Sequence, residues 1–317
     1  MNKLFSKKDI ICTIYREGSF SKASKALFIS QPALSAIVKQ AEEDIGVPLI
    51  DRSCKPIMMT EAGMEYIRAA EQITAIEESF TNYVQAVNNI STGTLKVGCN
   101  QLFSVLVIPR YISAFIEAYP KVEVKLTNAS SPELQEKLTG GTLDLVIDSK
   151  VFPEDSFEGR LFYKEHLLLA VPAAFSVNEE LKACALTRKD ILSGRHLDDD
   201  VAAVNLSALK DTPFLRLTKD NDTRQRTDRI FQESGFTPKV ILEVDRLITM
   251  HEYVHLGTAA GIVTDTLVRY SEDSGKDVCF YKLTGDMVSR DVFVYCKRNK
   301  YRLPAVDGFI DLLCRGR

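Results

Sequence analysis

Residues 18–63, GSFSKASKALFISQPALSAIVKQAEEDIGVPLIDRSCKPIMMTEAG, decide the fold of the N-terminal part of the chain. The small residues Ala23, Ser24 and Ala26 allow a second helix to cross residues 21–28 closely. After a turn of about three residues, Ser30 offers a capping hydroxyl and Pro32 lies in the first turn of another helix. Two short helices joined in this way predict a helix-turn-helix.

The flanking residues complete a small domain over residues 1–60. Ser6 and Asp9 have the spacing of a capping box, which predicts a first helix that ends near Gly18, and Ser21 is expected to cap the second helix. After Gly46, residues 47–60 form two extended runs around a basic turn at 52–56. We therefore expect a wing beside the three helices.

The outer side of the third helix carries polar groups at its N-terminal end, where a helix-turn-helix presents side chains to the major groove. Short polar side chains can bond to base edges, and basic ones in the helix or wing can meet phosphate. The DNA-facing candidates are Ser30, Gln31, Pro32, Ala33, Ser35, Lys39, Arg52 and Lys55.

A long helix is predicted from Thr60 to Asn89, because this stretch has no proline and its apolar residues recur at steps of three and four. At 1.5 Å per residue, about 27 residues reach roughly 40 Å. Its apolar stripe needs a partner, either its own domain or the same helix of a second copy. The stripe consists of Ile67, Ala70, Ile73, Ile76, Phe80, Tyr83, Val84 and Val87.

Beyond residue 91 strands alternate with helices, which is typical of parallel α/β structure. Expected strands are 95–100, 123–130, 143–149, 166–172, 213–217, 239–244 and 261–265, with closing strands at 279–283 and 291–296 and a last helix at 304–314. Because the closing strands follow a second α/β unit, we expect the chain to cross back and complete the first lobe.

Charge and composition are those of a globular protein with a basic N-terminal domain at residues 1–60. Residues 1–60 carry seven lysines and two arginines against six acidic residues, so their net charge is +3. The whole chain has a net charge of −3, so the remaining residues together carry −6. With no secretory leader or apolar run of membrane-spanning length recognised, a cytoplasmic chain without membrane association is expected. The seven scattered cysteines show no C-x-x-C pair and are interpreted mostly as small buried hydrophobes.

The N-terminal segment resembles that of the LysR-type transcriptional regulators. The runs GSF, A-S-x-A-L, S-Q-P-A-L-S, E-x-x-x-G-V-P-L-x-x-R and T-E-A-G occur in order at family spacing, with departures at Ser24, Ala41 and Ile50. The resemblance implies a winged helix-turn-helix at 1–60, a linker dimerisation helix at 61–90, and an effector domain at 91–317. That domain would be of periplasmic-binding-protein type, with lobe I at 91–163 and 270–317 and lobe II at 164–269.

The resemblance also implies double-stranded DNA, a small effector and further copies of the chain as partners, in dimers that pair into tetramers. Ligands in such sheets lie beyond the carboxyl ends of strands, beside helix N-termini. The effector, a small polar or anionic organic molecule, is therefore expected between the lobes. The candidate residues are Cys99, Asn100, Gln101, Asn128, Ser130, Asp148, Ser149, Asn221, Thr223 and Arg224, with Ala129, Asp222 and 243–245 beside them.

One motif favours a different function. His251-Glu252-Tyr253-Val254-His255 matches H-E-x-x-H, in which two histidines bind zinc and the glutamate acts as a base. A zinc metallohydrolase and a cytoplasmic solute-binding protein are therefore the alternatives to a regulator, and Cys99 is an alternative redox sensor. The favoured reading has no catalytic residue, metal or cofactor.

Overall fold

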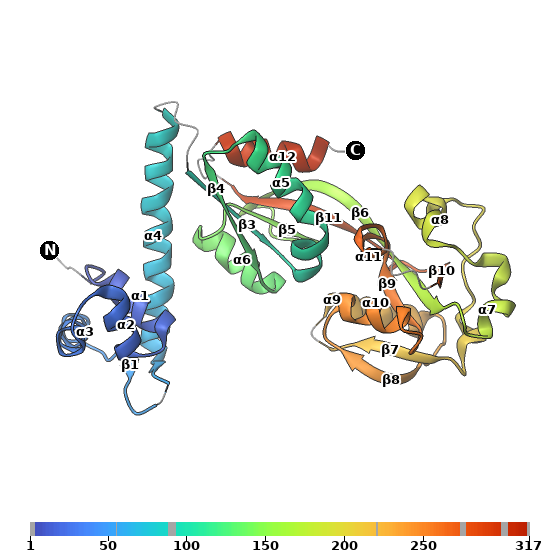
Figure 1. Cartoon of the computed structure of the whole chain (residues 1–317), viewed down its shortest axis with the longest axis horizontal. Helices are drawn as coiled ribbons and strands as arrows, with labels where there is room; N and C mark the ends of the chain where they lie inside the picture. The colour runs from blue at the N-terminus through green and yellow to red at the C-terminus, as the bar shows by residue number, and fades with distance from the viewer. Residues whose placement is uncertain are drawn as a thin grey trace. The chain divides into compact units, whose positions relative to one another are not determined.

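The computed structural model describes residues 4–54, 56–87, 93–219, 221–272, 277–298 and 304–315. The chain divides into two compact units, residues 1–93 with 136–143, and residues 94–135 with 144–317 (Figure 1). Over the described ranges, none of the helices combines the length and hydropathy required to cross a bilayer.

The first unit is helical with a two-stranded wing. Its elements are α1 (Lys8–Glu17), α2 (Phe20–Leu27), α3 (Gln31–Ile45), β1 (Ile50–Asp51), β2 (Met58–Met59) and α4 (Glu61–Val87). Ile11, Leu34, Val38 and Ile67 are buried together in its core, so three short helices pack against the start of the long one. The wing strands pair antiparallel, Ile50 opposite Met59.

The helix ends in this unit partly differ from those expected. Gly18 ends α1 in the left-handed conformation, as predicted, because glycine adopts positive φ without a Cβ clash. The capping residue of α1 is Lys7, without a side-chain cap, so the Ser6 capping box is wrong. Ser19, rather than Ser21, precedes α2. The Ser30 cap is confirmed, since its hydroxyl accepts a hydrogen bond from the backbone N–H of Ala33.

The T-E-A-G run fixes the wing to the start of α4. The Thr60 hydroxyl accepts a hydrogen bond from the N–H of Gly63 (3.0 Å) and donates one to the carbonyl of Pro48 (2.7 Å). A Cβ at position 63 would stand 2.0 Å from the carbonyl oxygen of Leu49. Only glycine therefore allows this close crossing.

The second unit contains a seven-stranded sheet and a two-stranded parallel sheet. Its first lobe contributes β3 (Gly93–Cys99), a π-helical turn at Phe103–Val107, α5 (Ile108–Ala118), β4 (Val122–Asn128), α6 (Ser131–Gly140), β5 (Leu145–Asp148) and α12 (Pro304–Arg315). The second lobe contributes α7 (Val177–Glu180), α8 (Arg188–Ser193), β7 (Pro213–Leu217), α9 (Asp222–Glu233), β8 (Lys239–Val244), α10 (Leu247–His255), β9 (Gly261–Thr264), α11 (Asp265–Tyr270) and β10 (Val278–Lys282).

Two long strands, β6 (Phe157–Pro172) and β11 (Ser289–Lys297), connect the lobes. The order in the large sheet is β10-β6-β11-β5-β3-β4, and β9 also pairs with β6. β11 pairs antiparallel with β5 of the first lobe. β10 pairs antiparallel with the end of β6, from Val278 opposite Pro172 to Lys282 opposite Leu168.

Candidate functional site

The N-terminal end of α3 presents a polar surface. Gln31, Pro32 and Ala33 are exposed and Ser35 is half-buried. Lys39 is 71% exposed and lies 3.7 Å from Glu43, one turn further along the helix. The Ser30 hydroxyl is already used by the cap. Of the predicted polar contacts on this helix, Gln31 and Lys39 are therefore exposed and Ser35 is partly accessible.

The wing arginine has a structural partner. The Arg52 guanidinium lies 3.0 Å from Oε2 of Glu42 on α3. The other oxygen of Glu42 accepts hydrogen bonds from the N–H groups of Leu49 (2.9 Å) and Ile50 (3.1 Å). Arg52 thus helps to hold the wing against α3, and its charge is partly neutralised. Lys55, the other wing candidate, lies outside the described residues.

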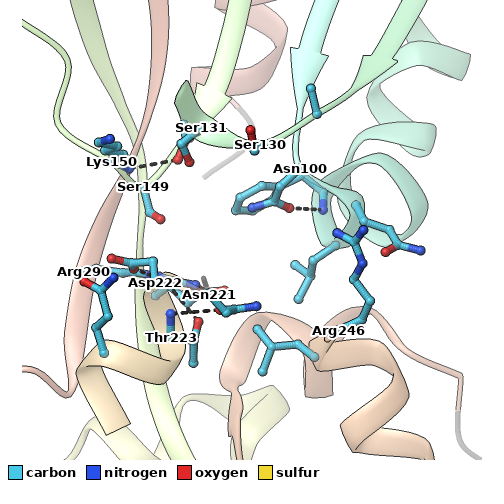
Figure 2. A pocket seen from close by; sticks show the side chains of 18 of the residues that line it. Asn100, Ser130, Ser131, Ser149, Lys150, Asn221, Asp222, Thr223, Arg246 and Arg290 are labelled. Atoms are coloured by element: carbon cyan, nitrogen blue, oxygen red, sulfur yellow. Dashed lines mark hydrogen bonds and ion pairs between the residues drawn. The ribbon is translucent and has the colours of Figure 1, made fainter. Parts of the chain in front are cut away.

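The second unit contains a cavity of about 430 Å³, a size that suits a small organic molecule. Seven of the ten predicted effector residues line it: Asn100, Gln101, Ser130, Asp148, Ser149, Asn221 and Thr223, together with their neighbours Ala129 and Asp222. Figure 2 shows these side chains converging from both lobes. The structure thus brings most of the predicted strand ends and helix starts together around one cavity.

Three helices begin at the cavity wall. Ser131 opens α6, Asp222 opens α9 behind the capping residue Asn221, and Arg246 precedes α10. The Asn221 side chain accepts a hydrogen bond from the N–H of Thr223 at 3.0 Å. Helix N-termini carry partial positive charge and free N–H groups. This wall can therefore receive acceptor atoms of a ligand.

A buried ion-pair network forms another part of the wall. Arg290 of β11 donates to Oε2 of Glu165 on β6 through Nε (2.7 Å) and lies 2.6 Å from it through Nη2. Its Nη1 donates to Asp222 (2.7 Å) and to the Thr223 hydroxyl (3.2 Å). The Glu165 and Arg290 side chains are only 1% and 8% exposed. One guanidinium thus joins both connecting strands to the start of α9.

Two carboxylate oxygens in the wall, Oε1 of Glu165 and Oδ2 of Asp148, have no hydrogen-bond partner among the residues that the structure describes. Burial raises the pKa of Asp148, although backbone N–H groups of Lys150 and Ser149 and the nearby Ser131 hydroxyl oppose that shift. Buried polar atoms are costly when unpaired, so these oxygens favour a ligand with O–H or N–H donors.

Three predicted effector residues are not among those that line the cavity. Cys99 is fully buried, and burial raises the pKa of its thiol to about 12, which also argues against a redox sensor. Asn128 ends β4 outside the cavity. Arg224 is buried on another face of α9, where it pairs with Asp228 (2.7 Å) and Glu243 (3.2 Å).

Eleven further residues line the cavity that were not predicted from the sequence: Leu102, Phe103, Ser131, Pro132, Lys150, Glu165, Gln225, Arg246, Leu247, Ile248 and Arg290. Arg246 could have been found, because it directly precedes α10 and follows the strand expected at 239–244, so it lies at a helix start. Glu165 and Arg290 carry no comparable local signal, since they lie inside strands.

The H-E-x-x-H segment in α10 does not assemble a zinc site. His251 is buried, and burial lowers its pKa to about 3. Nδ1 of His255 is 2.9 Å from the carbonyl oxygen of His251, and Glu252 is 65% exposed. Within the described residues, no third metal-ligating side chain joins the two histidines.

Two family models match the chain. One, described as "Bacterial regulatory helix-turn-helix protein, lysR family", matches residues 8–64, and the other, "LysR substrate binding domain", matches residues 89–316. A relative from Trieres chinensis, named "Probable RuBisCO transcriptional regulator", is 23% identical over 310 residues, 96% of this chain and 94% of that protein. A relative of the same name from Emiliania huxleyi is 33% identical over 170 residues, 52% of this chain and 54% of that protein.

Solved structures share the fold over the whole chain. Full-length CbnR, solved as a complex with its target DNA, has a TM-score of 0.68 at 20% identity, with 99% of each chain covered. Full-length OxyR from Pseudomonas aeruginosa has a TM-score of 0.69 at 19% identity, covering 99% of this chain and 98% of that one. These similarities confirm the expected fold class, a helix-turn-helix unit followed by a two-lobed α/β domain.

Proposed function

Because the chain belongs to the LysR family of bacterial transcriptional regulators, we propose that the cavity of its second unit binds the effector that controls DNA binding by its first. The family models make the chain a DNA-binding regulator with a substrate-binding domain. The single observation that carries the assignment of the site is the convergence of strand ends and helix starts from both lobes on one 430 Å³ cavity.

We propose that the effector is a small polar organic molecule with acceptors at one end and donors at the other. The starts of α6, α9 and α10, together with Arg246, favour a carboxylate or another acceptor group. The unpaired oxygens of Glu165 and Asp148 favour hydroxyl or amine groups. Acidic and basic residues of the lining are equal in number, three each, which disfavours a polyanion.

A thermal-shift screen of small polar metabolites tests this assignment, because a ligand that binds the folded state raises its melting temperature. The Arg246 side chain is 55% exposed, so Arg246→Gln can remove a ligand contact without opening the core. The matched control is Arg229→Gln, a 57% exposed arginine on α9 that does not line the cavity. If every hit stabilises the Arg246 variant as much as the parent and the control, the cavity is not the effector site.

For DNA recognition we propose that the start of α3 reads base edges, with Gln31, Ala33 and Ser35 in the groove and Ser30 and Pro32 shaping the helix start. The proposed phosphate contacts are Lys39, Arg52 and Lys55. The contribution of Arg52 is reduced because its charge is partly neutralised by Glu42. Ser35→Trp is expected to abolish operator footprinting while oligomerisation persists, whereas Ser35→Ala should weaken it modestly. Full footprinting by the tryptophan variant would count against α3 as the reading helix.

We propose that α4 pairs with α4 of a second copy, and that such dimers associate into tetramers. Ile76, Phe80 and Val84 follow one another at four-residue steps along α4, and their side chains are 68%, 66% and 42% exposed. Two copies would place two reading helices on a two-fold symmetric site. Ile76→Glu should dissociate the oligomer in sedimentation velocity, and an unchanged sedimentation coefficient would refute pairing at this position.

We propose that the chain acts only as a regulator and not as an enzyme, in the compartment that holds its target DNA, the cytoplasm in a bacterium. The buried, weakly basic His251 and the outward-directed Glu252 support this reading over a zinc hydrolase. The solute-binding alternative leaves α1 to α3 without a role. Hydrolytic activity that is lost with Glu252→Gln would overturn the proposal.

A further inference from the structure

Three side chains that the effector cavity does not use meet on another part of the second unit. His166 lies on β6, His196 lies in a short 3-10 turn (Arg195–Leu197), and Asp265 opens α11. Each offers one metal-ligating atom, and these atoms all lie within 4.8 Å of one another. The segments are 30 to 99 positions apart in the chain, so the fold and not local sequence brings them together.

The distances in this cluster resemble the edges of a coordination tetrahedron. Oδ2 of Asp265 is 3.3 Å from Nδ1 of His166 and 3.2 Å from Nε2 of His196. Zinc bonds of about 2.0–2.1 Å in tetrahedral geometry place two ligand atoms about 3.3–3.4 Å apart. A charge-assisted hydrogen bond from imidazole to carboxylate is shorter, about 2.7–2.9 Å. The two observed separations match the spacing of two ligands of one ion, and they are long for charge-assisted hydrogen bonds.

The orientation of the carboxylate also fits a ligand. Oδ1 of Asp265 accepts hydrogen bonds from the backbone N–H groups of His166 (2.9 Å) and Thr266 (2.8 Å). These bonds fix the plane of the carboxylate and direct Oδ2 alone towards both imidazoles. Hydrogen bonds that orient a ligand from outside are a general feature of protein metal sites.

We propose that His166, His196 and Asp265 bind one divalent transition-metal ion, with zinc the best match to two imidazoles and a carboxylate. The side chains of His196 and Asp265 are 1% and 6% exposed, whereas that of His166 is 23% exposed. The fourth coordination position therefore opens on the side of His166, where water can enter. Three protein ligands and one open position are a common zinc arrangement.

The site lies where β6 passes from one lobe to the other. His166 is opposite Ser289 of β11, while its neighbour Leu167 is opposite Thr264 of β9. Successive side chains of a strand point to opposite faces, and Glu165 lines the cavity. The ion would thus tie β6 to α11 and to the turn at 195–197, on the reverse face of the strand that carries the effector site.

Zinc binding by the full-length, chelator-treated protein tests the proposal, measured by competition with a chromophoric chelator. We expect one tightly bound equivalent, and His196→Gln and Asp265→Asn should each weaken binding at least about 100-fold, since even outer partners are worth 10–100-fold. The chain has four histidines, so His251→Gln/His255→Gln is a matched control that should bind zinc like the parent. Cobalt should give the intense visible absorption of a four-coordinate ion in parent and control only.

Absence of zinc binding by the parent, or binding that is lost in the His251/His255 control and kept in the other two variants, would overturn the proposal. Far-UV circular dichroism shows whether the ligand variants fold. If neither His196→Gln nor Asp265→Asn folds, the site is tested by hydrogen exchange of the parent protein with and without zinc. Slower exchange on adding zinc, confined to peptides around residues 166, 196 and 265, supports the site, whereas protection elsewhere or nowhere refutes it.

Discussion

Replacing Arg290 by methionine should destabilise the second unit strongly, because it leaves the Glu165 carboxylate buried without a cation. Glu165 would lose both contacts from the guanidinium, at 2.7 and 2.6 Å, in a position that is 1% exposed. Breaking a buried pair from one side typically costs about 3–5 kcal/mol. The lost contact to Asp222 adds little, since that side chain is 58% exposed.

Hydrogen exchange of the full-length protein measures this locally. Each 1.36 kcal/mol corresponds to a factor of ten, so a loss of about 3 kcal/mol should accelerate exchange of the protected β6 and β11 amides about 100-fold or more. The double variant Glu165→Leu/Arg290→Met removes both charges and should recover at least about 2 kcal/mol of the loss, because a buried ion pair can often be replaced by apolar residues at little cost. If the double variant is as unstable as Arg290→Met alone, the loss comes from packing and the reasoning is refuted.

Three further outcomes follow from single side chains. Gly63→Ala should destabilise the first unit by about 1–3 kcal/mol through overpacking against the Leu49 carbonyl, and an unchanged urea midpoint would contradict this. Cys99 should be among the last thiols to react with iodoacetamide at neutral pH, as peptide mapping would show, since its pKa is raised to about 12. The pKa of His251 is about 6.5 in the unfolded chain and about 3 in the folded chain, so the free energy of unfolding decreases as the pH falls through this window. Between pH 7 and pH 5 the parent should lose about 2 kcal/mol more of this free energy than His251→Gln. Equal losses in the two proteins would exclude this histidine as the cause.

The helices of the first unit could be predicted because the residues that determine their ends and buried faces lie close together in the sequence. A glycine at position 18, a serine before Gln31 and an apolar period of 3.6 act within a few residues, and they predicted the ends and faces of the helices. The errors were local too. Ser6 and Ser21 have capping chemistry, but the chain begins both helices one or two residues away, where packing of the helix pair decides the boundary.

Only those residues of the cavity wall that lie at strand ends or helix starts could be predicted from the sequence. Strand ends and helix starts are visible in a sequence, and they located Asn100, Ser130 and Asn221. The prediction that Cys99 contacts the effector is not supported, because successive side chains of a strand point to opposite faces and that of Cys99 points into the core. Glu165 and Arg290 are 125 positions apart, and only the antiparallel register of β6 and β11 sets them opposite one another.

We propose that β6 links the proposed effector cavity to the second lobe at Glu165 and His166, where its pairing changes from β11 to β9. An effector shifts a conformational equilibrium only if it binds two arrangements with different affinity. Glu165 couples the cavity wall to β11 and α9 through Arg290, so a ligand donor that engages its unpaired oxygen changes a contact shared by both lobes. His166, the next residue, meets Asp265 at the start of α11. Two adjacent residues of one strand thus connect the proposed effector site with the start of α11. Substitution of either residue should therefore alter how ligand binding in the cavity affects the second lobe.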